Sequence, residues 1–235
     1  MLTVLAMVPT YNESENIENL LKDILALDPT FGVLVVDDNS PDGTSKIVEK
    51  IQKTEPRVQL ITRRINRGRG VAGIEGLLNA ASQNFSYIVE MDADYSHHPR
   101  YIRDLLASMK NCDVAIGSRQ VGDGREIGRG FIRQFITLFA NGFIRTVMGV
   151  NINDCTSGFR CFKREVLQNI GLEKMVSIGP SIVEEILYAC HIQGYKIKEV
   201  PILFEDRIKG KSTKTFGQYI DTMLRIIQFR LTMKH

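Results

Sequence analysis

Five short apolar runs alternate with longer amphipathic stretches through the first half of the chain, and this alternation limits the possible folds. The runs span residues 2–8, 33–37, 58–62, 87–91 and 113–117. Mostly apolar runs of this length are typical of strands buried on both faces. Between the first two runs, apolar residues recur at helical spacing, as in Ile17, Leu20, Leu21 and Ile24. Alternating strands and helices predict an α/β fold with a mainly parallel sheet flanked by helices.

The composition is that of a globular protein with a single domain. Of its 235 residues, 43% are hydrophobic and 24% are charged, without a repeat, linker or low-complexity tract. Four cysteines without a CxxC pair predict reduced core residues of a cytosolic protein. No basic region precedes the first apolar run, so we expect a strand there and not a signal peptide. No apolar window is long enough to predict a transmembrane helix.

The second half of the chain is less regular and more basic. The net charge is only +3, but Arg and Lys are dense after residue 119, which favours an anionic partner about as strongly as a solvated basic face. The glycine-rich residues 119–130 predict a mobile loop, and residues 207–214 predict a basic loop. Residues 131–150 form a long apolar stretch, residues 183–193 predict a helix and residues 196–204 a strand. An amphipathic helix is expected over residues 216–234.

Two of the predicted strands end in paired carboxylates. Asp37 and Asp38 end the second run, and Asp92 and Asp94 follow the fourth. The carboxyl ends of parallel strands meet at one edge of an open sheet, where such folds bind ligands. Carboxylates that repel each other can share a divalent cation with a phosphate, and oxygen ligands favour Mg²⁺ or Mn²⁺ over Zn²⁺. The sequence therefore predicts a nucleotide and metal site at this edge.

Turn motifs follow the first and second strands. Asn12 and Glu15 match a capping box with Asn12 as the cap of the first helix. A nucleotide base could lie against Tyr11 at this turn, the alternative being a simple capped helix start. After the second strand, an acidic side chain could bind a base or ribose, while Asp42 caps the helix that begins at Thr44.

Two further patterns have ordinary structural explanations. Residues 68–73 match GxGxxG, the motif of dinucleotide sites, but they follow the third predicted strand and a strongly charged stretch. Close packing of a helix on the sheet is the favoured explanation of these glycines. His97 and His98 are metal-ligand types, but a helix that starts near Pro99 explains them equally well.

Five motifs in order give the chain a resemblance to a known family. They are Pro9-Thr10-Tyr11-Asn12-Glu13, Val36-Asp37-Asp38-Asn39-Ser40-Pro41-Asp42, Met91-Asp92-Ala93-Asp94, Gly117-Ser118-Arg119 and Ser157-Gly158-Phe159. Together they resemble the inverting nucleotide-sugar glycosyltransferases of family 2, which have a GT-A fold. Within that family the chain is most similar to the polyprenyl- (dolichyl-) phosphate mannose synthases. The resemblance covers nearly the whole chain.

This resemblance implies one glycosyltransferase domain over residues 1–235, with a nucleotide-sugar half (1–118) and an acceptor half (119–235). It implies inverting transfer of mannose from GDP-mannose to a polyprenyl phosphate, with Mg²⁺ or Mn²⁺ as cofactor. The implied nucleotide-sugar contacts are Pro9, Tyr11, Glu13, Val36, Asp38, Met91, Asp92, Ala93, Asp94 and Arg119. The implied metal ligands are Asp92, Asp94 and Ser96, and the implied acceptor-phosphate contacts are Arg119, Arg133, Arg207 and Lys214. The implied catalytic residues are Asp94, Arg119 and Arg133.

The chain departs from the family's pattern at two positions. Ser96 stands where relatives often have Gln, and a Ser hydroxyl is a weaker ligand. Residues 207–212 match the family's RxxGxS motif, but Thr213 follows where a lysine is expected. Lys211 or Lys214 would have to replace that lysine in binding the acceptor phosphate.

A charge argument agrees with this chemistry. A lipid monophosphate is already anionic, so its oxygen can attack the anomeric carbon without a general base. Arginines on the acceptor side and a divalent ion on the donor side would screen the repulsion between the two anions. The sequence has no arrangement typical of a His or Cys nucleophile. A hydroxyl acceptor would instead need a carboxylate base, for which the only candidates are Glu184 and Glu185.

Two alternatives to the mannosyltransferase stay open. One is a related transferase that uses UDP-glucose, UDP-GlcNAc or a hydroxyl acceptor, and the other is a non-catalytic nucleotide-binding or membrane-adaptor protein. The C-terminal amphipathic helix can lie in a bilayer interface or pack on its own domain, with equal weight. We expect a cytoplasmic enzyme peripheral at the cytoplasmic face of a membrane, with a membrane-anchoring partner subunit as an option and no nucleic-acid partner.

Overall fold

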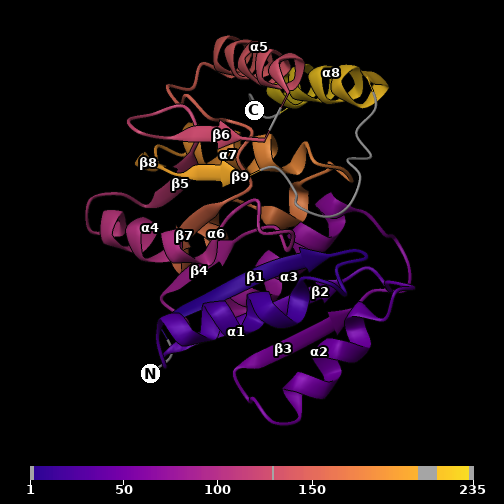
Figure 1. Ribbon diagram of the computed structural model, residues 1–235. Helices are drawn as coiled ribbons and strands as arrows, with labels where there is room; N and C mark the ends of the chain where they lie inside the picture. The colour runs from indigo at the N-terminus through magenta and orange to yellow at the C-terminus, as the bar shows by residue number, and fades with distance from the viewer. Residues whose placement is uncertain (1–2, 129, 206–215, 233–235) are drawn as a thin grey trace.

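A seven-stranded sheet runs through the molecule in the order β3-β2-β1-β4-β7-β5-β8 (Figure 1). The structure, a computed structural model, describes residues 3–128, 130–205 and 216–232, with the side chains of 216–222 and 232 left out. The strands are β1 (Val4–Thr10), β2 (Phe31–Asp37), β3 (Val58–Thr62), β4 (Tyr87–Glu90), β5 (Val114–Ser118), β7 (Arg160–Lys163) and β8 (Ile197–Pro201). All neighbours pair in parallel except β7, which runs antiparallel to β4 and β5. The prediction of a mainly parallel sheet is confirmed.

Helices cover both faces of this sheet. One face carries α1 (Ile17–Leu27), α2 (Thr44–Gln52) and α4 (Ile102–Ser108). The other face carries α3 (Arg69–Ser82), α6 (Arg164–Asn169) and α7 (Ile182–Ile192). Single 3₁₀ turns lie at Pro99–Tyr101 (η1), Met109–Asn111 (η2) and Leu172–Lys174 (η3). The two cores on the two faces explain why the strands are apolar on both sides.

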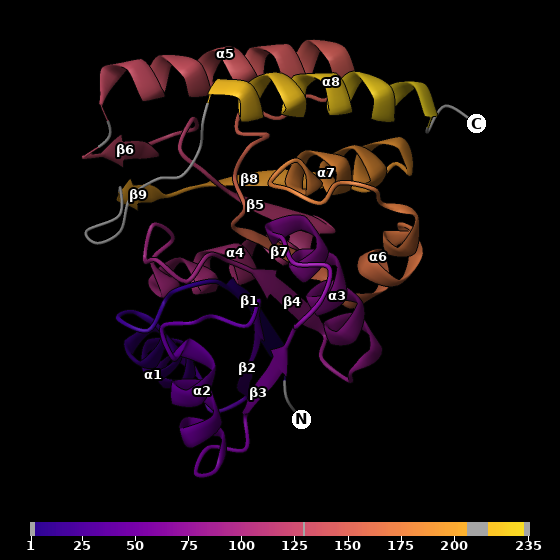
Figure 2. The same ribbon diagram turned by 90° about the vertical axis from the view of Figure 1, so that its right-hand side faces the viewer.

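Two longer helices lie side by side at one end of the molecule. They are α5 (Phe131–Met148) and α8 (Phe216–Thr232), and they lie at the end opposite β3 and α2 (Figure 2). A guanidinium N–H of Arg230 in α8 donates to the carbonyl of Val147 in α5 and ties the pair together. Neither is long and apolar enough to cross a bilayer, and the same is true of every other helix in the described residues.

The predicted capping box at Asn12 is wrong. Helix α1 begins at Ile17, and Asn12 has a left-handed backbone with φ of 60°. The backbone N–H groups of residues 12–14 donate to side chains of the 40–44 turn, so they are satisfied without a helical cap. Gly43, and not Asp42, is the N-cap residue of α2, but the Oδ1 of Asp42 accepts the Thr44 N–H at 3.0 Å and so satisfies the first N–H group of the helix.

The predicted mobile loop over residues 119–130 contains a strand. β6 (Arg125–Ile127) pairs in parallel with β9 (Leu203–Glu205) and forms a second, two-stranded sheet. The single strand predicted over residues 196–204 is divided into β8, which pairs with β5, and β9, which pairs with β6. At the division, the Ile202 N–H donates to the Ser118 carbonyl at 2.9 Å. A pairing between segments so far apart in sequence leaves no local pattern that would predict it.

The GxGxxG glycines pack α3 differently from the prediction, because Gly68 and Gly70 lie against the segment before α7, and the close contact with the sheet comes from Gly76, three residues after the pattern. Helix α3 lies against β1 and β2, and a Cβ atom at Gly76 would lie 2.6 Å from Met7 Sδ and 2.9 Å from Val36 Cγ2. A Cβ atom at Gly70 would lie 2.3 Å from the Ser177 carbonyl oxygen. The small residues therefore let α3 approach both the sheet and the segment before α7.

We predict that Gly76→Ala lowers the free energy of unfolding by about 1–3 kcal/mol, because the added methyl overpacks the contact with Met7. Gly142→Ala is the matched control, since Gly142 also lies inside a helix but has nothing within 4 Å of the added Cβ. That control should gain about 0.5–1 kcal/mol from lower backbone entropy. Urea denaturation of both variants measures the difference, and equal stability of the two would contradict the packing argument.

Candidate active site

The topology gathers most of the sequence motifs at one edge of the sheet. β1, β2, β4 and β5 are parallel, so their carboxyl ends at Thr10, Asp37, Glu90 and Ser118 lie along the same edge. Because β7 is antiparallel, its amino end lies there too and brings in residues 157–159. Ligands of open α/β sheets bind at this edge.

Asp37 is a structural carboxylate. It is fully buried and accepts hydrogen bonds from Thr10 Oγ1 at 2.9 Å, Ser40 N at 2.8 Å and Ser45 Oγ at 2.5 Å. These bonds fix the ends of β1 and β2 relative to the start of α2. The acidic pair after β2 therefore divides its roles, with Asp37 holding the turn.

Asp38 is also buried and already has partners within the protein. Its carboxylate pairs with Arg63 and accepts the Gly68 N–H at 2.7 Å. Tyr11 is about half exposed, at 51%, and the Arg67 guanidinium lies 5.2 Å from its ring centre. The exposed ring suits the predicted stacking on a base, and the nucleotide roles of Tyr11, Glu13 and Asp38 stay predictions.

The remaining predicted nucleotide contacts at the sheet edge are buried. Pro9, Val36, Met91 and Ala93 all have buried side chains. Val36 Cγ2 faces the backbone of Gly76 in α3. The nucleotide contacts of these four buried residues stay predictions.

Asp92 and Asp94 follow β4 at the same edge. The side chain of Asp92 is 35% exposed, and its Oδ1 lies 3.3 Å from Arg69 Nη2. Asp94 is buried, and its Oδ1 accepts Ser96 Oγ at 2.6 Å and Ser96 N at 3.1 Å. Ser96 thus orients Asp94, whether or not it also contacts a metal.

The two histidines differ in their surroundings. His98 Nδ1 accepts the Arg100 N–H at 3.2 Å, so this histidine caps the turn η1 as the helix-start explanation predicts. His97 is buried and stacks on Phe159, with ring centres 5.3 Å apart. Burial lowers the pKa of His97, although the charges of Asp92 and Asp94 act in the opposite direction. Its Nδ1 lies 3.7 Å from Asp92 Oδ2.

Asp92 and Asp94 are the predicted ligands of a divalent cation shared with a diphosphate, and their oxygen donors are of the right chemical type. Mg²⁺ and similar hard cations are usually held by one or two carboxylates and the substrate's phosphate oxygens. Within residues 3–128, 130–205 and 216–232, no group of three or more His, Cys, Asp or Glu side chains could hold a metal ion. The donor set of Asp92 and Asp94 therefore suits a cation that arrives with its phosphate ligand better than a metal in a closed protein cage.

Arg119 is held in a buried ion pair. Its Nε donates to Asp154 Oδ2 at 2.7 Å and its Nη2 to Asp154 Oδ1 at 2.5 Å, while Nη1 lies 3.3 Å from Glu126 Oε1. The guanidinium also lies 5.2 Å from the ring centre of Phe204. An acceptor phosphate would have to compete with these partners, and the catalytic and phosphate-binding roles of Arg119 stay predictions.

Of the other residues predicted to bind the acceptor phosphate, the structure describes Arg133 but not Arg207 or Lys214. Arg133 has an exposed side chain in the first turn of α5. Arg207 and Lys214 lie outside the described residues, as do Lys211 and Thr213. Their roles in binding the acceptor phosphate are therefore predictions from the sequence.

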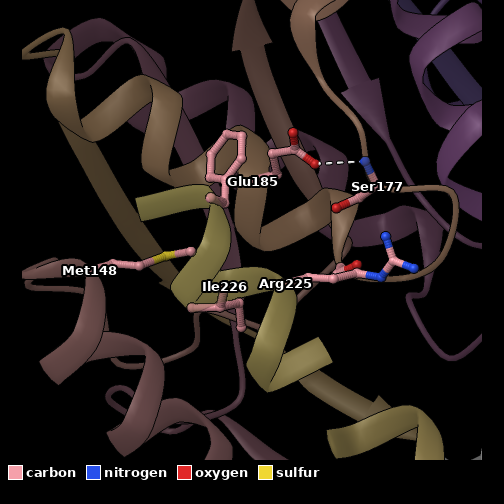
Figure 3. Close-up of a pocket in the computed structure, with 7 residues that line it drawn as sticks. Met148, Ser177, Glu185, Arg225 and Ile226 are labelled. Carbon is pink, nitrogen blue, oxygen red and sulfur yellow. Dashed lines mark hydrogen bonds between the residues drawn. The ribbon is translucent and has the colours of Figure 1, made fainter. Parts of the chain in front are cut away.

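Glu185 has a structural partner in the segment before α7. It is buried, and its two carboxylate oxygens accept the N–H groups of Val176 at 2.8 Å and Ser177 at 3.0 Å. Figure 3 shows this carboxylate pointing to the backbone of Ser177, in a crevice that Met148, Arg225 and Ile226 also line. A carboxylate that holds two backbone groups is poorly suited to act as the base for a hydroxyl acceptor.

Three site residues were missed in the sequence. Asp154 lies 35 residues from Arg119, and Arg63 lies 25 residues from Asp38. Arg69 reaches Glu90 and Asp92 from the start of α3. Each belongs to an ion pair that only the tertiary fold brings together, and the one local signal was the charged stretch at residues 63–67.

The mainly parallel sheet flanked by helices is the fold of GT-A glycosyltransferases. The sequence model of the family described as glycosyl transferase family 2 matches residues 6–171. The chain therefore belongs to glycosyltransferase family 2 and is a glycosyltransferase.

Two relatives are similar over nearly the whole chain. Polyprenol monophosphomannose synthase of Mycolicibacterium smegmatis is 34% identical over 227 residues, which cover 96% of this chain and 86% of the relative. Undecaprenyl-phosphate mannosyltransferase of Micrococcus luteus is 32% identical over 231 residues, which cover 98% of this chain and 95% of the relative.

Solved structures share the fold at lower sequence identity. Glucosyl-3-phosphoglycerate synthase of Mycobacterium tuberculosis, in complex with Mn²⁺, UDP and phosphoglyceric acid, superposes with a TM-score of 0.72 at 16% identity. The match covers 98% of this chain and 78% of that one. At this low sequence identity, the structural likeness shows the fold alone. The Mn²⁺ ion was bound in the structure of that other protein.

We predict that Asp154→Asn destabilises the protein by about 3 kcal/mol at neutral pH, because it leaves the buried Arg119 charge poorly compensated. Although burial opposes ionisation, the hydrogen bonds and charge of Arg119 hold the pKa of Asp154 below its usual 3.8. A depressed pKa contributes stability that is present above the unfolded value and lost as the pH falls through the folded value.

Urea denaturation of wild type and variant between pH 7 and pH 3 measures the effect, and the difference in their free energy of unfolding should begin to narrow only below about pH 4. Asp113→Asn is the matched control, since it removes a partly exposed pair with Lys163 that should contribute about 1 kcal/mol or less. A gap that is constant across this pH range would contradict the assignment.

Proposed function

We propose that this chain transfers mannose from GDP-mannose to a polyprenyl phosphate, with inversion at the anomeric carbon. The observation that carries the proposal is the similarity over nearly the whole chain to two proteins named for transfer to polyprenol or undecaprenyl phosphate. The acidic turn after β4 supports the donor half of the proposal. The choice of GDP over UDP comes from the family resemblance alone.

On the donor side, the nucleotide would lie against Tyr11 and near Asp38, and the diphosphate would lie at Asp92 and Asp94. A bound Mg²⁺ or Mn²⁺ would supply positive charge that neutralises the departing diphosphate. Ser96 holds Asp94 in orientation through its 2.6 Å hydrogen bond. The protein's own contribution is thus to fix two carboxylates before the donor arrives.

On the acceptor side, the reaction needs positive charge and no general base. An oxygen of the lipid phosphate forms a bond to C1 of mannose while the bond from C1 to the β-phosphate oxygen of GDP breaks. GDP leaves with that electron pair, and no proton has to move because the phosphate is already ionised. Arg133, Arg207 and Lys214 are the cations proposed to hold the incoming phosphate.

A membrane surface is the proposed source of the lipid. Helix α5 exposes large apolar side chains at helical spacing, and so does the adjacent α8. On α5 they are Phe131 at 82%, Ile132 at 75%, Phe135 at 63%, Leu138 at 54% and Phe139 at 59%. On α8 they are Leu224 at 61%, Ile227 at 41% and Leu231 at 67%. We propose that this surface lies in the interface of the cytoplasmic leaflet.

We expect Asp94→Asn to lower transfer from radiolabelled GDP-mannose to polyprenyl phosphate by roughly 100-fold or more, because it removes a proposed cation ligand. Thermal unfolding checks that the variant is folded. Asp104→Asn, an exposed acid on α4, is the matched control and should keep full activity. Transfer that survives both Asp94→Asn and a chelator would remove the metal role, and transfer only from UDP-sugars would replace the donor.

We also expect Phe135→Glu/Phe139→Glu to weaken binding to vesicles of anionic phospholipid on the order of 100-fold, since two aromatic side chains no longer enter the bilayer. Vesicle sedimentation measures the partition. Ile65→Glu/Leu78→Glu is the matched control, because it alters two exposed apolar residues away from α5 and α8. Equal binding of wild type and the α5 variant would end the proposal that this face meets the membrane.

A further inference from the structure

A buried ion pair lies directly behind the acidic turn and takes no part in the chemistry proposed so far. Glu90 at the end of β4 is fully buried, and its Oε1 accepts Arg69 Nη2 at 3.0 Å. The same Nη2 also donates to Asp92 Oδ1 at 3.3 Å. One nitrogen thus bridges a buried carboxylate and a carboxylate that faces the donor site.

Glycines build a slot for this guanidinium. A Cβ atom at Gly73 would lie 2.9 Å from Arg69 Nη1, and one at Gly158 would lie 3.6 Å from Nη2 and 3.8 Å from Asp92 Oδ2. At the start of α3, Gly68 has φ of 146°, and the Gly70 N–H donates to the Ile178 carbonyl at 2.8 Å. The GxGxxG segment, which is no dinucleotide motif here, therefore also fixes where Arg69 points.

The neighbouring Arg160 cannot take over this role. It is the Cα partner of Glu90 in the β4–β7 ladder, but its guanidinium donates to the carbonyls of Ser157, Val183 and Cys155. In the described part of the chain, Arg69 makes the hydrogen-bonded ion pair with Glu90. A pair that served only the stability of the core would not need to reach Asp92.

We infer that Arg69 is a positioning residue for Asp92, holding its carboxylate in the orientation that receives a divalent cation and the donor's diphosphate. The inference rests on the proposed function, since it gives Asp92 a cation to bind. Residues that orient a metal ligand typically change metal affinity by 10–100-fold when they are removed. The glycines of residues 68–73 gain a functional reason as well as a packing reason.

The test replaces both members of the pair, because Arg69→Met alone would leave Glu90 buried and unpaired. Mn²⁺ affinity in the presence of GDP is measured from the electron paramagnetic resonance signal of free Mn²⁺. We expect Arg69→Met/Glu90→Leu to bind Mn²⁺ about tenfold more weakly than wild type, at a similar Tm. Lys163→Met/Asp113→Asn removes an ion pair at the far end of β7 and should leave Mn²⁺ affinity unchanged.

Each outcome decides between the proposals. Wild-type affinity in the folded double variant would overturn the positioning role and leave the proposed function standing. If Asp92→Asn binds Mn²⁺ as tightly as wild type, the metal role of Asp92 fails and the inference fails with it. Should the double variant not fold, Gly73→Ala decides instead. It keeps both charges but moves the guanidinium, so its Mn²⁺ affinity should also fall, and unchanged affinity would overturn the inference.

Discussion

Pairing of carboxylates at the carboxyl edge of the sheet is the constraint on which this structure depends. A carboxylate taken out of water is costly unless charge and hydrogen bonds compensate it. Asp38 has Arg63, Glu90 has Arg69 and Asp154 has Arg119, each from a distant part of the chain. These three pairs connect the ends of β2, β4 and β5 to residues that follow β3, begin α3 and precede β7. The acidic turn at Asp92 and Asp94 is built on this neutralised edge.

The antiparallel strand β7 joins the two halves of the chain. It lies between β4 and β5, so a strand from the second half completes the sheet begun by the first. Its direction brings Gly158 and Phe159 to the donor edge, where Phe159 stacks on His97. A parallel strand at the same position would have carried these residues to the opposite edge. The direction of β7 thus matters to the site as much as the motif residues do.

The sequence predicted those parts of the fold whose signals are local. Apolar runs such as residues 33–36 give strands because burial on both faces favours apolar side chains at successive positions. The capping box predicted at Asn12 was wrong because the N–H groups of residues 12–14 donate to side chains of the 40–44 turn. Sequence spacing does not reveal these contacts. The partners of Arg119 and Arg69 were missed because an ion pair across 35 or 21 residues depends on the finished fold. The two aspartates of the turn, by contrast, stand next to a strand and could be predicted.

The position of α5 and α8 gives the proposed reaction a direction. Both helices lie at the β8 end of the molecule (Figure 1). Asp38, the proposed nucleotide contact, follows β2 near the other end of the strand order. A water-soluble donor and a lipid acceptor would then approach from different sides. Arg133 lies in the first turn of the helix that carries the exposed apolar face, so its charge would sit at the depth of lipid phosphates when that face enters a bilayer. An anionic acceptor could be bound there without leaving the interface, which avoids the cost of moving a long apolar chain into water.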